Sequence, residues 1–168
     1  YENLTGIFAI GRCGPEGVIL LTDRMGAYSV YAARDHKGQL RAIGSLPELV
    51  ASAAGRENDF DRASLAEIML RYAPIFPYTT RRGMQELSPG CFHEFVARAG
   101  CVDHVEQCLW TPSEPDRYPS LAGLREQLVA ALRTAGVELT RGVQRVAVTL
   151  SGGFDSRTVL AVIPPVKR

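Results

Sequence analysis

The feature that most constrains the fold is a glycine turn near the end of the sequence, within VQRVAVTLSGGFDSRTVLAVIPP (residues 143–165). The run before the turn, 143–150, is apolar almost throughout near its end, which is typical of a strand buried in a parallel sheet. A second apolar run follows the turn. The stretch therefore predicts a strand over 143–150, a tight turn, and a helix that Pro164 and Pro165 end after about nine residues.

A strand that enters a helix through such a turn forms an anion-binding site, because the helix N-terminus offers unpaired N–H groups and the positive end of the helix dipole. Gly152 and Gly153 allow positive φ and close approach of the backbone to an oxyanion. Ser151 and Ser156 can donate hydroxyl hydrogen bonds, and Asp155 can cap the helix or hold Mg²⁺. The pattern favours a phosphate or pyrophosphate ligand, and the alternative is a tight strand–helix connection that binds nothing.

The turn lacks the Gly-Lys-Ser/Thr of a Walker A loop and the third glycine of the dinucleotide-binding fingerprint. What stands there is Ser-Gly-Gly-x-Asp-Ser. Five fixed residues at ordinary frequencies match by chance about once in 10⁶ positions. The pattern is therefore specific enough to carry a functional hypothesis.

Upstream of the turn, the pattern is one of hairpins and short helices. Strands over 6–10, 17–22, 28–32 and 40–44 predict an antiparallel β-meander, with turns at 14–17 and 35–38. Helices are expected over 46–55 and 61–73, the second with apolar Leu65, Ile68, Met69 and Tyr72 at helical spacing. The segment 79–97 resembles a short hairpin around Pro89-Gly90, and 101–110 reads as a further strand.

The composition changes at TPSEPDRYPS, residues 111–120, a polar stretch with three prolines that reads as a linker. An amphipathic helix follows over 121–136, with one apolar face formed by Leu121, Leu124, Leu128, Ala131 and Leu132. We therefore expect two domains, 1–115 and 116–168. The first is α+β, and the second begins an α/β pattern.

Composition excludes several classes of protein. The formal net charge of +1 gives no electrostatic case for binding nucleic acid or an anionic membrane. No apolar run approaches the roughly 18 residues of a membrane span, and no signal peptide begins the sequence. Four cysteines are too few for a disulfide framework, so reduced thiols and a cytoplasmic location are expected.

The Ser-Gly-Gly-x-Asp-Ser turn resembles that of the PP-loop ATP pyrophosphatases, whose loop holds the pyrophosphate part of ATP. The resemblance implies an ATP site with Mg²⁺ near Asp155, contacts from the loop to the β- and γ-phosphates, and a nucleoside near Leu150. Arg157 either reaches a phosphate or is solvated. The residues that it assigns to ATP and pyrophosphate are Leu150, Ser151, Gly152, Gly153, Phe154, Asp155 and Ser156.

The upstream sequence resembles the asparagine synthetase family within this superfamily. The resembling motifs occur in the family's order along nearly the whole chain. Each is weak alone, and their order together with the loop is specific. They are Gly6-Ile7-Phe8-Ala9, Asp23-Arg24-Met25-Gly26, Tyr31, AIGSLPELVA at 42–51 and GMQELSPGCF at 83–92.

This resemblance implies a partial N-terminal-nucleophile (Ntn) glutaminase-type β-sandwich over 1–115 and the first strand, loop and helix of a PP-loop domain over 116–168. It implies a ligase that converts aspartate, glutamine and ATP into asparagine, glutamate, AMP and PPi. The partners would be these small molecules, with ammonia in place of glutamine as a variant. The resemblance also allows a homodimer.

Two departures leave other functions open. The family's nucleophilic Cys is expected in a segment before Tyr1, and the family's glutamine-binding Asp is replaced by Asn3. The first alternative is a related ligase with a degenerate glutaminase domain, such as a lasso-peptide cyclase or a β-lactam synthetase. The second alternative is an inactive fragment or pseudoenzyme that at most binds nucleotide.

Other polar clusters favour structural roles. Cys101-x-x-His104 invites a zinc site, but the spacings fit no common zinc motif, so buried thiols and surface histidines are expected. Asp23-Arg24 reads as an ion pair at a turn, and Arg81-Arg82 as a solvated loop. The zinc hypothesis also considers Cys91, His93 and Cys108. Before the helix expected over 61–73 lie Glu57, Asp59 and Asp61, which we expect to be solvated acids at the start of that helix.

Overall fold

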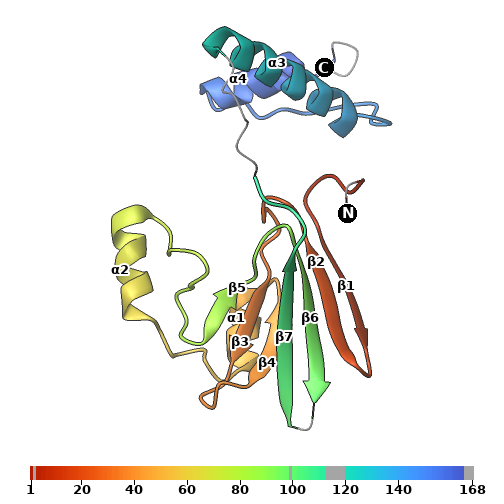
Figure 1. Cartoon of the computed structure of the whole chain (residues 1–168). Coiled ribbons are helices and arrows are strands. Elements are labelled where there is room, and N and C mark those ends of the chain that lie inside the picture. The colour runs from red at the N-terminus through yellow and green to blue at the C-terminus, as the bar shows by residue number, and fades with distance from the viewer. Residues whose placement is uncertain (2, 99, 113–119, 165–168) are drawn as a thin grey trace. The chain divides into compact units, whose positions relative to one another are not determined.

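The computed structural model describes residues 1, 3–98, 100–112 and 120–164 (Figure 1). The chain divides into two compact units, Tyr1–Ser113 and Glu114–Arg168. Most of the expected linker, residues 113–119, lies outside the described part of the chain, as does Pro165.

The described part of the first unit contains two antiparallel sheets and two helices (Figure 1). This content confirms the mixed α+β class. The four-stranded sheet has the order β1-β2-β6-β7, with β1 at Ala9–Gly14, β2 at Gly17–Thr22, β6 at Cys91–Arg98 and β7 at Cys101–Cys108. The three-stranded sheet has the order β4-β3-β5, with β3 at Tyr31–Arg34, β4 at Leu40–Gly44 and β5 at Met84–Glu86. The helices are α1, Pro47–Ala53, and α2, Arg62–Arg71.

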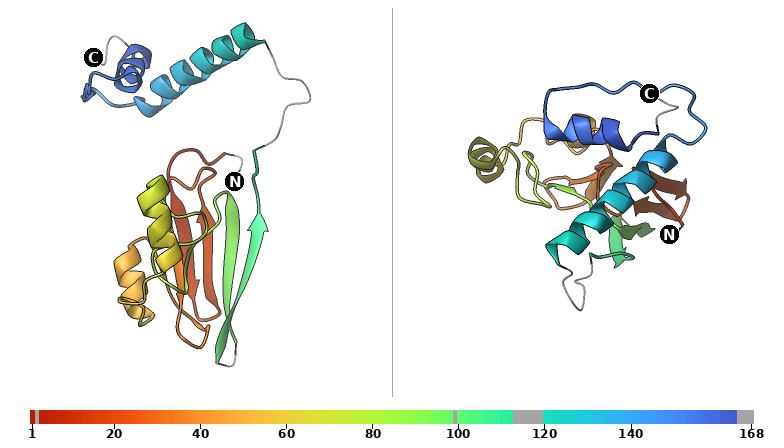
Figure 2. Two further views of the ribbon diagram at one scale, coloured as in Figure 1. Left: turned by 90° about the vertical axis from the view of Figure 1, so that its left-hand side faces the viewer. Right: turned by 90° about the horizontal axis from the view of Figure 1, so that it is seen from above.

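The hydrophobic core of the first unit lies on both faces of the three-stranded sheet. On one face, Phe95 packs with Val30 and Leu87, among partly buried side chains from strands of both sheets. On the other face, α1 is packed against Ala33 and Met84. Neighbouring residues of β3 point to opposite faces, so Ala32 and Ala33 belong to different clusters. The layers of the first unit are therefore sheet, sheet and helix. Figure 2 (left) shows α1 and α2 on the same side of the sheets.

Two hairpin turns form where the sequence predicts them. The side chain of Asp35 accepts backbone N–H bonds from Lys37 (2.8 Å) and Gln39 (3.0 Å), and also pairs with Arg41. The β1–β2 turn brings Gly14 opposite Gly17. These turns depend on short-range bonds, which explains why local sequence identifies them.

The expected pairing of strands is wrong in two places. Strands β1–β2 and β3–β4 belong to different sheets, so they do not form one meander. The strands on either side of Pro89-Gly90 are not a hairpin either, because β5 pairs with β3 and β6 pairs with β2. Each strand instead joins the sheet in which its apolar face meets the shared core. The first strand also begins at Ala9 rather than at residue 6.

The second unit contains α3, Leu121–Leu139, and α4, Phe154–Val162. Ser120 caps α3 by accepting the N–H of Gly123 at 3.2 Å. The helices meet at Gly136, where an added Cβ would lie 2.5 Å from the carbonyl oxygen of Val162. Helix α4 spans nine residues, as the following prolines predict. Among the described helices, none has the length and apolarity that a membrane crossing requires.

The expected strand over 143–150 does not form a β-ladder, and this prediction is wrong. A strand is stabilised by bonds to a neighbour, and the described part of the second unit holds no other strand. The expected apolar faces are also not buried in α2 and α3. Met69 of α2 is 85% exposed and Leu121 of α3 is 85% exposed. Helical spacing identifies an apolar face but not a partner for it.

Asp23 is a buried anchor for the turn that follows β2. Its side chain accepts backbone N–H bonds from Met25 and Ala27, both at 3.0 Å, and from Tyr28 at 2.9 Å. The expected Asp23–Arg24 ion pair is not among the ion pairs of the described residues, and the guanidinium of Arg24 lies over the Tyr1 ring, 5.6 Å from its centroid. Burial raises the pKa of Asp23, but the N–H donors together outweigh burial and leave the pKa below its usual value.

Asp23→Asn is expected to lower the free energy of unfolding at pH 7 by about 2 kcal/mol, because buried N–H donors lose a charged acceptor. The lowered folded pKa means that Asp23 stabilises the fold above its unfolded pKa and that this stability is lost as the pH falls through the folded pKa. The variant should therefore lose less stability than the wild type on acidification. Urea unfolding at a series of acidic pH values measures this. An equal change of unfolding free energy with pH in both proteins would contradict this expectation. Asp103→Asn, at an exposed position of β7, is the control.

Candidate functional site

The glycine turn joins the segment 143–150 to α4. Gly152 has φ +81°, in the left-handed region that favours glycine, although a Cβ there would meet nothing within 4 Å. Gly153 is the N-cap residue of α4 and is extended, with φ −76° and ψ 171°. Because the N-cap is glycine, it supplies no capping side chain. The backbone conformation, rather than packing, therefore explains the glycine at 152.

Two serine hydroxyls lie together at this helix end. The Oγ atoms of Ser151 and Ser156 are 3.4 Å apart. Ser151 Oγ accepts the N–H of Gly153, and Ser156 Oγ donates to the carbonyl of Gly153, each at 3.4 Å. Bonds of this length are weak. A ligand with better acceptor geometry can therefore replace them at little cost.

The remaining side chains of the turn are largely exposed. Arg157 donates to the carbonyl oxygens of Gly153 (3.1 Å) and Gly152 (3.3 Å), and its guanidinium lies 4.8 Å from the centroid of Phe154. Arg157 thus engages the turn's own carbonyls. Asp155 lies exposed in the first turn of α4, and the exposed fractions of Leu150 and Phe154 are 58% and 82%. The turn is open to solvent within its own unit.

Asn3 belongs to the first unit and is exposed in a turn in which Leu4 donates its N–H to the carbonyl of Tyr1. A nearby groove of about 270 Å³ is lined by residues 4–8 and by 23–25 and Ala27. Asn3 is not among these lining residues.

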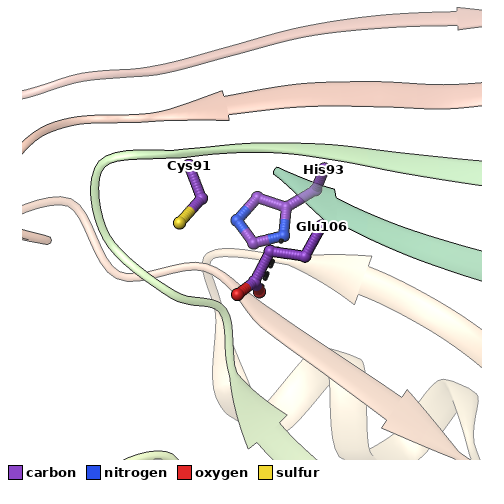
Figure 3. A group of neighbouring side chains, drawn as sticks. All are labelled: Cys91, His93 and Glu106. Atoms are coloured by element: carbon purple, nitrogen blue, oxygen red, sulfur yellow. Dashed lines mark ion pairs between the residues drawn. The ribbon is translucent and has the colours of Figure 1, made fainter. Parts of the chain in front are cut away.

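A second polar group lies on β6 and β7, and the sequence did not predict it as a unit. Cys91 and His93 lie two residues apart on β6, and Glu106 of β7 is paired directly with His93 (Figure 3). The thiol sulfur, a ring nitrogen and a carboxylate oxygen of these three residues all lie within 4.8 Å of one another. His93 is completely buried, whereas the Glu106 side chain is 39% exposed.

The expectation of buried thiols and surface histidines is therefore wrong in part. Cys91 is buried as expected, but His93 is buried too, and Cys101 and Cys108 are exposed. Alternation along β6 turns Cys91, His93 and Phe95 toward the core together. The i, i+2 spacing of the Cys and His was a usable signal for this, but finding Glu106 required the register of the β6–β7 hairpin.

The electrostatics of this group reflect its burial. Burial, the Glu106 carboxylate and the neighbouring Cys108 raise the pKa of the Cys91 thiol to about 12. Burial and the nearby His93 lower the pKa of His104, whose ring stacks on Phe95 at 4.3 Å between centroids. In the absence of a cation, Cys91 is a neutral thiol and His104 favours its neutral imidazole.

No protein-family model matches the chain, and no curated protein matches it. The family resemblance therefore depends on the motifs of the sequence alone. The domain assignments and the roles of the loop residues stay predictions.

In chelator-treated protein at pH 8, iodoacetamide should modify Cys13, Cys101 and Cys108 but leave Cys91 unmodified until the protein unfolds. The thiolate is the nucleophile, so a pKa near 12 together with burial should slow alkylation of Cys91 by about a hundredfold or more. Peptide mapping by mass spectrometry measures the rate at each thiol. Alkylation of Cys91 as fast as Cys13 in the folded protein would contradict the structure.

Proposed function

We propose that this chain is part of an ATP-dependent, amide-forming ligase of the asparagine synthetase type. The observation that supports the proposal is the Ser-Gly-Gly-Phe-Asp-Ser turn at the N-terminus of α4. In that turn Gly152 has positive φ, and the hydroxyls of Ser151 and Ser156 converge. The proposal adds that the turn binds the pyrophosphate part of ATP. The upstream motifs, in the order of that family, support the same assignment.

The chemistry of the turn fits a pyrophosphate. Backbone N–H groups at the start of α4 and the helix dipole favour an anion, and the two hydroxyls are neutral donors beside them. Asp155 adds a negative charge to the same turn, which an ATP complex would offset with Mg²⁺. In the proposed reaction a carboxylate oxygen attacks the α-phosphorus and PPi leaves. An amine or ammonia then attacks the acyl carbon and AMP leaves.

In this proposal the first unit corresponds to part of an Ntn glutaminase-type sandwich, and the second to the opening of a PP-loop domain. Two antiparallel sheets packed around Phe95 support the first assignment. The proposed substrates are ATP, glutamine or ammonia, and aspartate or another carboxylate, in a cytoplasmic protein that can form a homodimer.

Two observations favour narrower versions of this function. Asn3 in place of an acid favours a relative that joins an amine already present in its substrate, as lasso-peptide cyclases and β-lactam synthetases do. The missing ladder over 143–150 favours a chain that binds nucleotide weakly at most. The glutaminase form and the relative that uses an amine of its own substrate differ in one activity. In the protein of the complete reading frame, release of glutamate from glutamine favours the glutaminase form, and its absence favours the relative.

Binding at the turn can be measured on this chain by NMR. Titration with Mg²⁺ and inorganic pyrophosphate should shift the backbone amides of 152–156 most. We expect a Kd on the order of 1 mM, because no strand among the described residues of the second unit supports the turn. Gly152→Ala should remove the response, since alanine disfavours positive φ.

Gly142→Ala is the matched control, because Gly142 also has positive φ (+75°) and lies in a turn of the same unit outside the loop. It should carry the same backbone strain and keep the pyrophosphate response. Shifts that survive in Gly152→Ala, or that spread evenly over both units, would refute binding at the turn.

For the protein of the complete reading frame, we expect carboxylate-dependent exchange of labelled PPi into ATP. Asp155→Ala should reduce this exchange by a hundredfold or more, on the order of the loss when one transition-state contact is removed. Asp103→Ala in β7 should leave it unchanged. Exchange that persists at the wild-type rate in Asp155→Ala would contradict the assignment of the loop to ATP, whichever carboxylate is the substrate.

A further inference from the structure

The inward face of the β6–β7 hairpin carries a row of metal-binding side chains that the proposed ATP chemistry does not use. The register places Cys91 opposite Cys108, His93 opposite Glu106, and Phe95 opposite His104. Alternation along each strand turns all of these side chains to the same face. Three of them converge, and Figure 3 shows the sulfur, the imidazole and the carboxylate turned toward one another.

The hydrogen bonds of His93 indicate which ring nitrogen is available. Its Nε2 lies 3.0 Å from the carbonyl oxygen of Ser88, which can only accept, so Nε2 carries the proton. In the neutral ring Nδ1 then presents a lone pair, and this atom faces Glu106 Oε2 at 3.4 Å and His104 Nε2 at 3.2 Å. That lone pair can accept a hydrogen bond from His104 Nε2, or it can bind a cation together with the Glu106 carboxylate. A metal ion satisfies the nitrogen and the carboxylate together.

The separations around His93 Nδ1 fit a tetrahedral ion, and the Cys91 sulfur lies within 4.8 Å of the other ligand atoms of the group. Two ligand atoms bound at about 2.0–2.1 Å with a tetrahedral angle lie about 3.3 Å apart, and zinc has these bond lengths to nitrogen and oxygen. The distances of 3.4 Å and 3.2 Å around His93 Nδ1 are close to this value. The bond from Nε2 to a backbone carbonyl is also the usual outer partner of a metal-binding histidine.

We propose that Cys91, His93 and Glu106 form a Zn²⁺ site on the inward face of the β6–β7 hairpin, with His104, whose Nε2 lies 3.2 Å from His93 Nδ1, as a donor for the fourth position. Sulfur, nitrogen and oxygen in one set suit Zn²⁺ better than Mg²⁺ or Ca²⁺, which take oxygen ligands. Binding breaks the S–H bond of Cys91, forms an S–Zn bond and releases one proton to solvent. The thiolate and the carboxylate then balance the two charges of the ion.

The place of the site in the fold indicates a structural role. Cys91 begins β6, directly after the segment that passes between the two sheets, and its N–H donates to Thr22 Oγ1 at 3.1 Å. Ser88, in the same segment, receives hydrogen bonds from both His93 and Thr22. An ion held there links β6 and β7 to the crossing between the sheets. Zinc should therefore stabilise the first unit.

Cobalt is the probe for this site, because a thiolate bound to Co²⁺ absorbs in the near ultraviolet. We expect the chelator-treated, reduced chain to bind one Co²⁺ with that absorption, and one equivalent of Zn²⁺ to displace it. Cys91→Ser should abolish the thiolate band. Glu106→Gln, at a partly exposed position that should not disturb folding, should weaken Zn²⁺ binding at least tenfold.

Cys101→Ser is the matched control, since Cys101 lies in the same hairpin but on the opposite face of β7, and it should leave both signals unchanged. Zn²⁺ should also raise the melting temperature of the wild type and of Cys101→Ser but not of Cys91→Ser, with folding of each variant checked by circular dichroism. Absence of a thiolate band in the wild type would overturn the proposal. So would a band that survives Cys91→Ser and is lost in Cys108→Ser.

Discussion

The face-to-face packing of the two antiparallel sheets is the constraint on which the first unit depends. Phe95 is the largest side chain at its centre, and it packs with Val30 and Leu87 while strands of both sheets surround it. The shared core decides which strands pair, because each strand must turn its apolar face toward it. The same alternation along β6 that buries Phe95 also buries His93 and Cys91, at the polar end of that face.

That polar end is held by hydrogen bonds rather than by apolar packing. Thr22 and Asp23, at the end of β2, are both buried and bond to the segment that runs into β6. Buried polar groups are costly unless they find partners, and here almost every partner is a backbone group. The arrangement therefore fixes the path of the chain between the sheets. It also leaves His93 with one ring nitrogen facing a carboxylate, which is the basis of the proposed zinc site.

The two candidate sites differ in what supports them. The glycine turn is a sequence motif with suitable local geometry, and its proposed ligand depends on the resemblance to a family. The group on β6 and β7 fits no common sequence motif, and its support is geometric. The glycine turn is therefore tested by measuring whether pyrophosphate or ATP binds to it. The group on β6 and β7 is tested by measuring whether a metal ion binds to its side chains. Failure of either test leaves the other unaffected.

The sequence by itself determined the elements that depend on short-range interactions. The Asp35 hairpin, the helices α1 to α4 of the described residues, the end of α4 before Pro164 and the left-handed Gly152 follow from neighbours a few residues apart. Tertiary structure alone decided the pairing of β6 with β2, the meeting of His93 with Glu106, and the absence of a ladder over 143–150. These features depend on partners distant in sequence or on a neighbouring strand, and a local pattern of apolar residues carries no information about which partner is present.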